Sequence, residues 1–127
     1  EFLLPPPDLI LPVPLHVKRL RKRGFNQAYL LAKACFPGWR DRIRVDLLER
    51  HRWTEPQTNL SGTDRRQNLH GAFGLTCTDT TANEIAGKRI LLVDDIFTTG
   101  STVQECAMVL RAAGAARVEV FTVARAV

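Results

Sequence analysis

Long apolar segments are absent from this chain of 127 residues. An aliphatic run such as Ile90 to Val93 is far shorter than the roughly 20 residues that a helix needs to cross a membrane. The first residues also lack the charged, apolar and small-residue order of a signal peptide. We therefore expect no membrane contact and a cytoplasmic location. Because the chain starts with Glu1 and not with Met, we expect it to be a fragment of a longer protein.

Cysteine is scarce, with three residues, Cys35, Cys77 and Cys106, and no CxxC pair. This odd number argues against a structural zinc site and indicates the reduced thiols of the cytoplasm. Hydrophobic residues make up 45% and charged residues 24%, which disfavours disorder, collagen and coiled coil. The length is one domain's worth of sequence, so we expect a single domain over residues 1–127.

Acidic residues are fewer than basic ones, at 13 against 18, which gives a net charge of +5. This excess favours an anionic partner, either a phosphate ester or a nucleic acid. Five of the six positions from Lys18 to Arg23 are basic and directly precede Asn26, a good helix N-cap. Arginine can bind phosphate oxygens with two parallel hydrogen bonds. Alternatively, this run is a solvated face or a DNA-contacting patch.

Hydrophobic periodicity predicts an α/β fold with a mainly parallel, open sheet flanked by helices. The expected strands cover residues 9–13, 43–47, 72–75, 90–93 and 118–123, and the expected helices run from Asn26 to Cys35 and from Ser101 to a stop at Gly114. Residues 79–84 are expected to form a polar connection. Residues 50–71 are polar and rich in arginine, which is typical of a functional or mobile loop when it is this long.

The segment from Ile90 to Thr102 carries the strongest chemical signal. A buried strand is expected to end in Asp94 and Asp95, and a loop of small hydroxylated residues then opens a helix. The free N–H groups at a helix start, together with threonine and serine hydroxyls, suit a phosphate monoester. The two carboxylates suit neutral donors such as sugar hydroxyls, or a metal ion. The alternative is that both acids are loop residues and that Thr102 and Glu105 form only a capping box.

This segment resembles the ribose-5-phosphate recognition motif of type I phosphoribosyltransferases, which use phosphoribosyl pyrophosphate (PRPP). The resemblance implies that Asp94 and Asp95 hold the 2- and 3-hydroxyls of the ribose and are the catalytic acids. The residues implied to hold the 5-phosphate are Thr98, Thr99, Gly100, Ser101 and Thr102.

More of the chain is similar to the ComF/GntX branch of competence-associated phosphoribosyltransferases. The similar segments are Pro12 to His16, Arg19 with Arg23 to Ala28, Arg50 with Thr54, Gln57 and Leu60, and Arg65, Arg66 and Asn68 leading to Phe73. The resemblance implies that Arg19, Arg23, Gly24 and Asn26 lie at the pyrophosphate. It also implies that residues 50–71 form a mobile lid with Arg50, Gln57, Arg65 and Arg66. Full-length members commonly carry an N-terminal cysteine zinc ribbon, which this chain lacks.

The expected activity is therefore transfer of a phosphoribosyl group from PRPP to an acceptor that the sequence does not identify, with a link to DNA uptake through a competence-machinery partner. The resemblance implies Mg²⁺ bound mainly through PRPP, and we assign no protein side chain as its ligand. Two alternatives stay open. The chain could be a module of the same fold that binds DNA through Lys18 to Arg23, or a PRPP sensor that consumes none.

Overall fold

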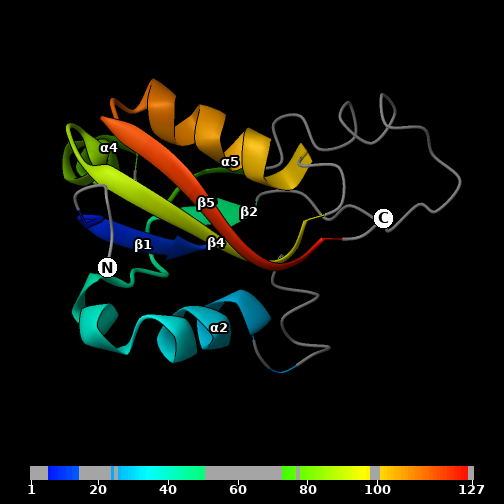
Figure 1. Ribbon diagram of the computed structural model, residues 1–127. Helices are drawn as coiled ribbons and strands as arrows, with labels where there is room; N and C mark the ends of the chain where they lie inside the picture. Colours follow the sequence, from blue (N-terminus) through cyan, green and yellow to red (C-terminus); the bar gives the residue numbers. More distant parts are fainter. Residues whose placement is uncertain are drawn as a thin grey trace, which may run out of the picture.

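A three-stranded parallel sheet forms the centre of the protein (Figure 1). The computed structural model describes residues 6–14, 24, 26–50, 73–76, 78–97 and 101–125. In the sheet, β4 (Arg89–Phe97) lies between β1 (Leu9–Pro12) and β5 (Arg117–Arg125), and both neighbours are parallel to it. The other elements are a two-stranded antiparallel sheet of β2 (Leu48–Arg50) and β3 (Phe73–Leu75), the helices α2 (Gln27–Cys35), α4 (Thr78–Ile85) and α5 (Ser101–Ala112), and the 3-10 helix η1 (Pro37–Arg42).

The aliphatic run of β4 is buried on both faces, as the sequence predicts. Ile90 and Leu92 pack into one hydrophobic cluster with residues of α5, and Val93 packs into a second cluster with Ala32 of α2. Figure 1 shows α2 on one side of the sheet and α5 on the other. Side chains alternate between the faces of a strand, so a central strand between two helical layers needs apolar residues at every position. This requirement explains why the run carries no alternating polar residue.

Helix α2 confirms the helix predicted from residue 26. The side chain of Asn26 accepts a hydrogen bond from the Tyr29 N–H at 3.2 Å, and the helix buries the small residues Ala28 and Ala32 against the sheet. After the helix, the Phe36 ring meets that of Phe121 in β5 edge to face, with centroids 5.1 Å apart. The helix is thus fixed at its first turn by the cap and at its end by an aromatic contact.

Helix α5 also follows its predicted spacing. Val103, Cys106 and Leu110 lie three and four residues apart and are all buried in the larger cluster. Gly114 follows the helix at a φ of +97°, a conformation that residues with a Cβ rarely adopt. The predicted stop at this glycine is confirmed. The following strand β5 covers the predicted 118–123.

The prediction of a strand over residues 43–47 is wrong. Only Ile43 forms a bridge, to Ile10 of β1, and strand β2 starts at Leu48. Residues 45–47 form a bend, and Val45 is 60% exposed. Alternation alone cannot distinguish a strand from an extended segment whose apolar residues do not all reach a core.

The expected polar connection over residues 79–84 is also wrong, because this segment lies in helix α4. The helix buries Thr81 and Ile85, which are four residues apart and therefore on one face. Its sequence is rich in Thr, Asp and Asn, which are weak helix formers. Packing of that one face supplies the stability that local propensity lacks.

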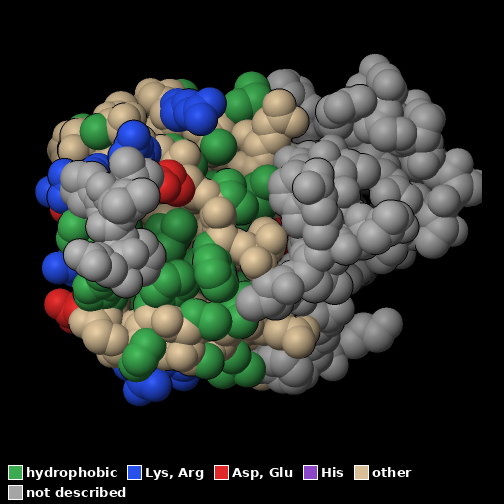
Figure 2. Space-filling view, viewed as in Figure 1, with side chains coloured by type: hydrophobic (Ala, Val, Ile, Leu, Met, Phe, Trp, Pro, Cys, Tyr) green, Lys and Arg blue, Asp and Glu red, His purple; other side chains and the backbone are tan. Residues whose placement is uncertain are grey.

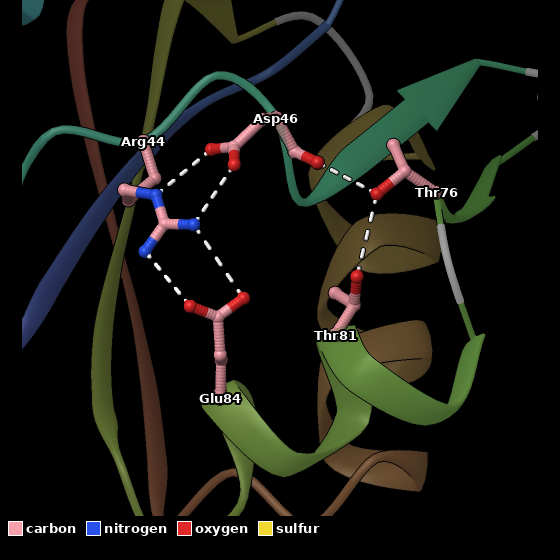
Figure 3. A network of polar contacts seen from close by, with 5 residues as sticks. All are labelled: Arg44, Asp46, Thr76, Thr81 and Glu84. Carbon is pink, nitrogen blue, oxygen red and sulfur yellow. Dashed lines mark hydrogen bonds and ion pairs between the residues drawn. The ribbon is translucent and has the colours of Figure 1, made fainter.

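A polar network joins the bend before β2 to α4 (Figure 3). The Arg44 guanidinium donates hydrogen bonds to both carboxylate oxygens of Asp46 at 2.8 Å and to Glu84 at 3.1 and 3.4 Å. The Thr76 hydroxyl donates to the Asp46 carbonyl at 2.6 Å and meets the Thr81 hydroxyl at 3.3 Å. The hydrogen bonds from Arg44 lower the pKa of Asp46. Three separate segments are therefore held together by one arginine and two hydroxyls.

We expect Asp46→Asn to remove a pH-dependent part of the stability. A carboxyl whose pKa is lowered by folding stabilises the protein above its unfolded-state pKa of about 3.9, and this contribution is lost as the pH falls through the folded-state pKa. Because Asp46 is largely exposed, the loss at pH 7 should stay below about 1 kcal/mol. Urea unfolding of both proteins at neutral and acidic pH should show this difference shrinking in acid. The exposed Asp41→Asn is the matched control, and an equal pH dependence there would contradict the assignment.

Candidate functional site

The candidate site lies at the edge of the sheet where the parallel strands end. Strands β1, β4 and β5 run in one direction, so their carboxyl ends share this edge. Helices α2 and α5 both begin at the same edge, one on each side of the sheet (Figure 1). In open α/β sheets, ligands bind at such an edge, because loops and helix N-termini converge there. The fold thus brings together motifs that are more than 60 residues apart in the sequence, around Asn26 and around Asp94.

Asp94 and Asp95 lie inside β4, although the sequence suggested that the strand ends at them. The strand continues to Phe97, and Asp94 pairs in register with Thr122 of β5. Asp94 is half-buried, and alternation along the strand places it on the side of Leu92, which faces α5. For Asp95, Ser101 and the strand end at Phe97 the structure describes the backbone alone.

The pKa of the Cys106 thiol in α5 depends on burial and on nearby charges, among them that of Asp94. Burial raises the pKa of its thiol to about 12, and the negative charge of Asp94 adds to this rise. The positive charge of Arg50 acts in the opposite direction, and Glu105 adds a smaller rise. The charges of Asp94, Arg50 and Glu105 therefore all act on the Cys106 thiol. No sequence pattern links Cys106 with these charges, because the residues come from three different elements.

The start of α5 lies where a phosphate cradle is expected. The helix begins at Ser101, and Thr102 is half-buried in its first turn. Thr102 is thus inside the helix and not at the position before it, which the capping-box interpretation requires. Thr98, Thr99 and Gly100 lie outside the described residues.

Arg50 is the last residue of β2 and is not part of a loop, which corrects the expected start of the lid at this residue. Its guanidinium carbon lies 5.3 Å from the ring centroid of Phe73 in β3, which is buried in the core. This cation–π contact holds the arginine against strand β3, which lies beside α5. The other residues assigned to the lid, Gln57, Arg65 and Arg66, lie outside the described residues.

The turn assigned to pyrophosphate is described at two positions. Gly24 is exposed and has a φ of +81°, which explains the glycine there. Asn26 caps α2 and also donates its side-chain amide to the Val13 carbonyl at 3.3 Å, so it joins the end of β1 to the helix start. Arg19 and Arg23 lie outside the described residues.

We expect Asn26→Ala to destabilise the protein by about 1–2 kcal/mol, because it removes the helix cap. Asn26→Asp keeps the capping oxygen and loses only the amide that binds the Val13 carbonyl, so its loss should be smaller. Chemical denaturation of the three proteins measures both values. Equal losses for the two variants would show that the cap contributes nothing.

In the described part of the chain, no group of three or more His, Cys, Asp or Glu residues is arranged to hold a metal ion. None of the helices described is long and apolar enough to span a membrane.

The fold of the chain is that of the type I phosphoribosyltransferases, as predicted. A solved structure described as the allosteric regulatory enzyme of purine biosynthesis superposes with a TM-score of 0.51 over 92% of this chain and 22% of its own. The two sequences are only 19% identical, so this likeness concerns the fold alone. The family is shown by a direct match: residues 43–126 fit the model of the phosphoribosyl transferase domain, and the chain belongs to this family.

Curated relatives confirm the resemblance to the competence-associated branch. Competence protein F of Haemophilus influenzae is 41% identical over 121 residues, which are 94% of this chain and 51% of the relative. The DNA utilization protein YhgH of Escherichia coli K12 is 38% identical over 94% of this chain and 50% of its own length. Competence protein ComFC of Bacillus subtilis is 34% identical, over 92% and 44%. The chain thus spans about half the length of the curated relatives that it matches.

Proposed function

We propose that the protein transfers a phosphoribosyl group from PRPP to an acceptor. The observation that carries this proposal is the position of Asp94: a half-buried carboxylate in the carboxyl-terminal half of the central strand, on the side of the helix whose first turn follows the expected phosphate loop. The family match covers this whole segment. The competence-related names of the relatives support a role beside DNA uptake.

In the proposed site, each part of PRPP has a recognition element of suitable chemistry. Asp94 and Asp95 accept hydrogen bonds from the ribose hydroxyls, which carboxylates do without competing for the phosphates. Ser101 and Thr102, with the free N–H groups that begin α5, receive the 5-phosphate. The turn at Gly24 and Asn26 approaches the pyrophosphate from the other side of the sheet, and Arg19 and Arg23 are assigned there from the sequence.

The reaction then needs little chemistry from the protein. The acceptor forms a bond to C1 of the ribose while the bond from C1 to pyrophosphate breaks, and positive charge develops on the ring. The carboxylates near the ribose hold the ring in position. Oxygen ligands are those that Mg²⁺ prefers, and the PRPP oxygens would supply most of them. When bound, the ion neutralises charge on the leaving pyrophosphate.

The test is a thermal melt with PRPP and Mg²⁺, compared with PRPP alone, ribose 5-phosphate and a short DNA. A ligand at about 100 times its dissociation constant stabilises the folded state by about 2.7 kcal/mol, which is a shift of several degrees for a domain of this size. We expect the largest shift with PRPP and Mg²⁺ together. No shift under these conditions would refute the proposal.

A second candidate function is DNA binding without transfer, favoured by the net charge of +5 and by the DNA utilization proteins among the relatives. Binding to several DNA phosphates weakens by orders of magnitude between about 50 and 200 mM salt. A salt-sensitive shift with DNA and none with PRPP would therefore select this function. A PRPP shift without release of pyrophosphate over a range of acceptors would instead indicate a sensor.

A further inference from the structure

The guanidinium of Arg50 lies against the hydrophobic core. The basic side chains seen in Figure 2 lie on the outer parts of the described surface, whereas the Arg50 Nε atom is buried. The guanidinium carbon is 5.3 Å from the ring centroid of Phe73, and this ring packs in the larger hydrophobic cluster with Leu92 of β4 and Cys106 of α5. Arg50 therefore brings a positive charge to the side of the sheet that α5 covers.

Asp94 lies on this same side of the sheet. Leu92 and Asp94 are two residues apart in β4, so alternation along the strand directs both toward α5. Besides burial, the charges of Asp94 and Arg50 both act on the Cys106 thiol, and they do so in opposite directions. Coulomb interactions weaken with distance, so the carboxylate and the guanidinium both lie near this sulfur atom. An acid of the candidate site and a cation held by the core thus share one environment.

Arg50 is the cation that balances the acids at this position. Glu105 of α5 is a second carboxylate that acts on the same thiol. In register with Asp94, β5 carries the uncharged Thr122, and β1 pairs with β4 only as far as Val93. Helix α2 packs against the opposite face of the sheet. Within the described part of the chain, the charges that act on this position are therefore two carboxylates and one guanidinium.

A half-buried carboxylate needs such a cation to stay ionised. Burial and a neighbouring carboxylate both favour the protonated form of a carboxyl, and an opposite charge within about 4–6 Å favours the ionised form. Arginine suits this role because it stays protonated throughout the ordinary pH range and can stack on an aromatic ring. The contact with Phe73 gives Arg50 this support.

We propose that Arg50 is a positioning residue that acts through Asp94: held against Phe73, its guanidinium keeps the carboxylate ionised, so that it accepts hydrogen bonds from the ribose hydroxyls. Arg50 does not act on PRPP itself. This role differs from the lid function that the family resemblance implies for Arg50. The inference rests on the proposed function, in which Asp94 binds the ribose, so its test begins with the chain free of PRPP.

The first test follows the Asp94 carboxyl carbon by NMR during a pH titration of the ligand-free chain. In Arg50→Met, the midpoint of this titration should rise by about one pH unit or more, because the charge that favours the ionised form is removed. Arg50→Lys keeps the charge and should shift the midpoint by less. Methionine can still pack on the Phe73 ring. If circular dichroism shows that this variant does not fold, Arg50→Gln is the second uncharged replacement.

Arg42→Met is the matched control. The Arg42 guanidinium carbon lies 5.7 Å from the ring centroid of Trp39, so this substitution removes the same kind of cation–π contact. Trp39 packs with the cluster on the α2 side of the sheet, opposite to Asp94. The Asp94 titration should not change in this variant. An equal shift in Arg42→Met would show an effect of net charge alone and would overturn the proposal.

The second test measures PRPP affinity, with Mg²⁺, over the same pH range. Compared with the unaltered chain, Arg50→Met should lose about tenfold in affinity at a pH below both midpoints and little above them, since a shift of one unit changes the ionised fraction tenfold. A uniform loss at every pH would mean that Arg50 contacts PRPP directly, and it would overturn the positioning role.

The inference and the proposed function fail in different ways. An Asp94 midpoint that Arg50→Met leaves in place overturns the role of Arg50, whatever the PRPP affinity. An unaltered chain that binds no PRPP refutes the proposed function, even where the titration shift is present.

Discussion

Asp94→Asn together with Asp95→Asn should abolish PRPP binding while the protein stays folded. Both substitutions keep the size of the side chain and remove the negative charge that accepts hydrogen bonds from the ribose hydroxyls. Charge-assisted hydrogen bonds contribute about 1.5–3 kcal/mol each, so the loss of two should weaken binding by at least about 100-fold. Titration calorimetry with PRPP and Mg²⁺ measures this loss directly.

The control for this variant is Asp41→Asn, which makes the same chemical change at an exposed position in η1. It should bind PRPP as the unaltered chain does. The double variant also offers an internal readout, since the negative charge of Asp94 contributes to the raised pKa of Cys106. Its thiol should become somewhat easier to ionise, although burial still keeps the pKa high. Retained PRPP affinity in a folded variant would refute the site.

Leu92→Ala should cause a large loss of stability. Leu92 is fully buried in the central strand and packs against α5. Replacing such a leucine by alanine removes buried apolar surface and leaves a cavity, at a cost of about 2–5 kcal/mol. This is a large fraction of the 5–15 kcal/mol typical of a whole domain, so the melting temperature should fall by roughly 10 °C or more.

Leu30→Ala is the matched control, because Leu30 is 44% exposed on helix α2. The chemical change is identical, and alanine is an even better helix former, so stability should change by less than about 0.5 kcal/mol. Differential scanning calorimetry of the three proteins gives both values. Similar losses for the two variants would mean that the burial of Leu92 does not determine its contribution.

Features set by local sequence could be predicted. The cap at Asn26, the aliphatic run from Ile90 and the stop at Gly114 each follow from a few neighbouring residues, and each is present in the structure. Helix α4 could not be predicted, because its stability comes from packing Thr81 and Ile85 against other elements. The continuation of β4 through its acidic pair could not be predicted either, because it depends on pairing with β5, which lies more than 20 residues away in the sequence.

For the candidate site, the sequence identified residue types and the structure adds their surroundings. The orientation of Asp94 toward α5 follows from strand alternation only once the strand is known to continue past it. The contact of Arg50 with Phe73 depends on the pairing of β2 with β3, two short strands separated by 22 residues that lie outside the described part. No local pattern encodes such a contact, because its partners are joined only by the tertiary fold.

The pairing of β1 with β4 has a consequence for how this protein forms. The Arg89 N–H donates to the carboxylate of Asp8 at 2.9 Å, across 81 residues of sequence. On a ribosome, β1 and α2 emerge well before β4 and lack this central strand until it has been synthesised. Such non-local pairing slows folding and leaves the early apolar segments exposed during synthesis. A nascent chain that stops before Arg89 should therefore be an early substrate for chaperones.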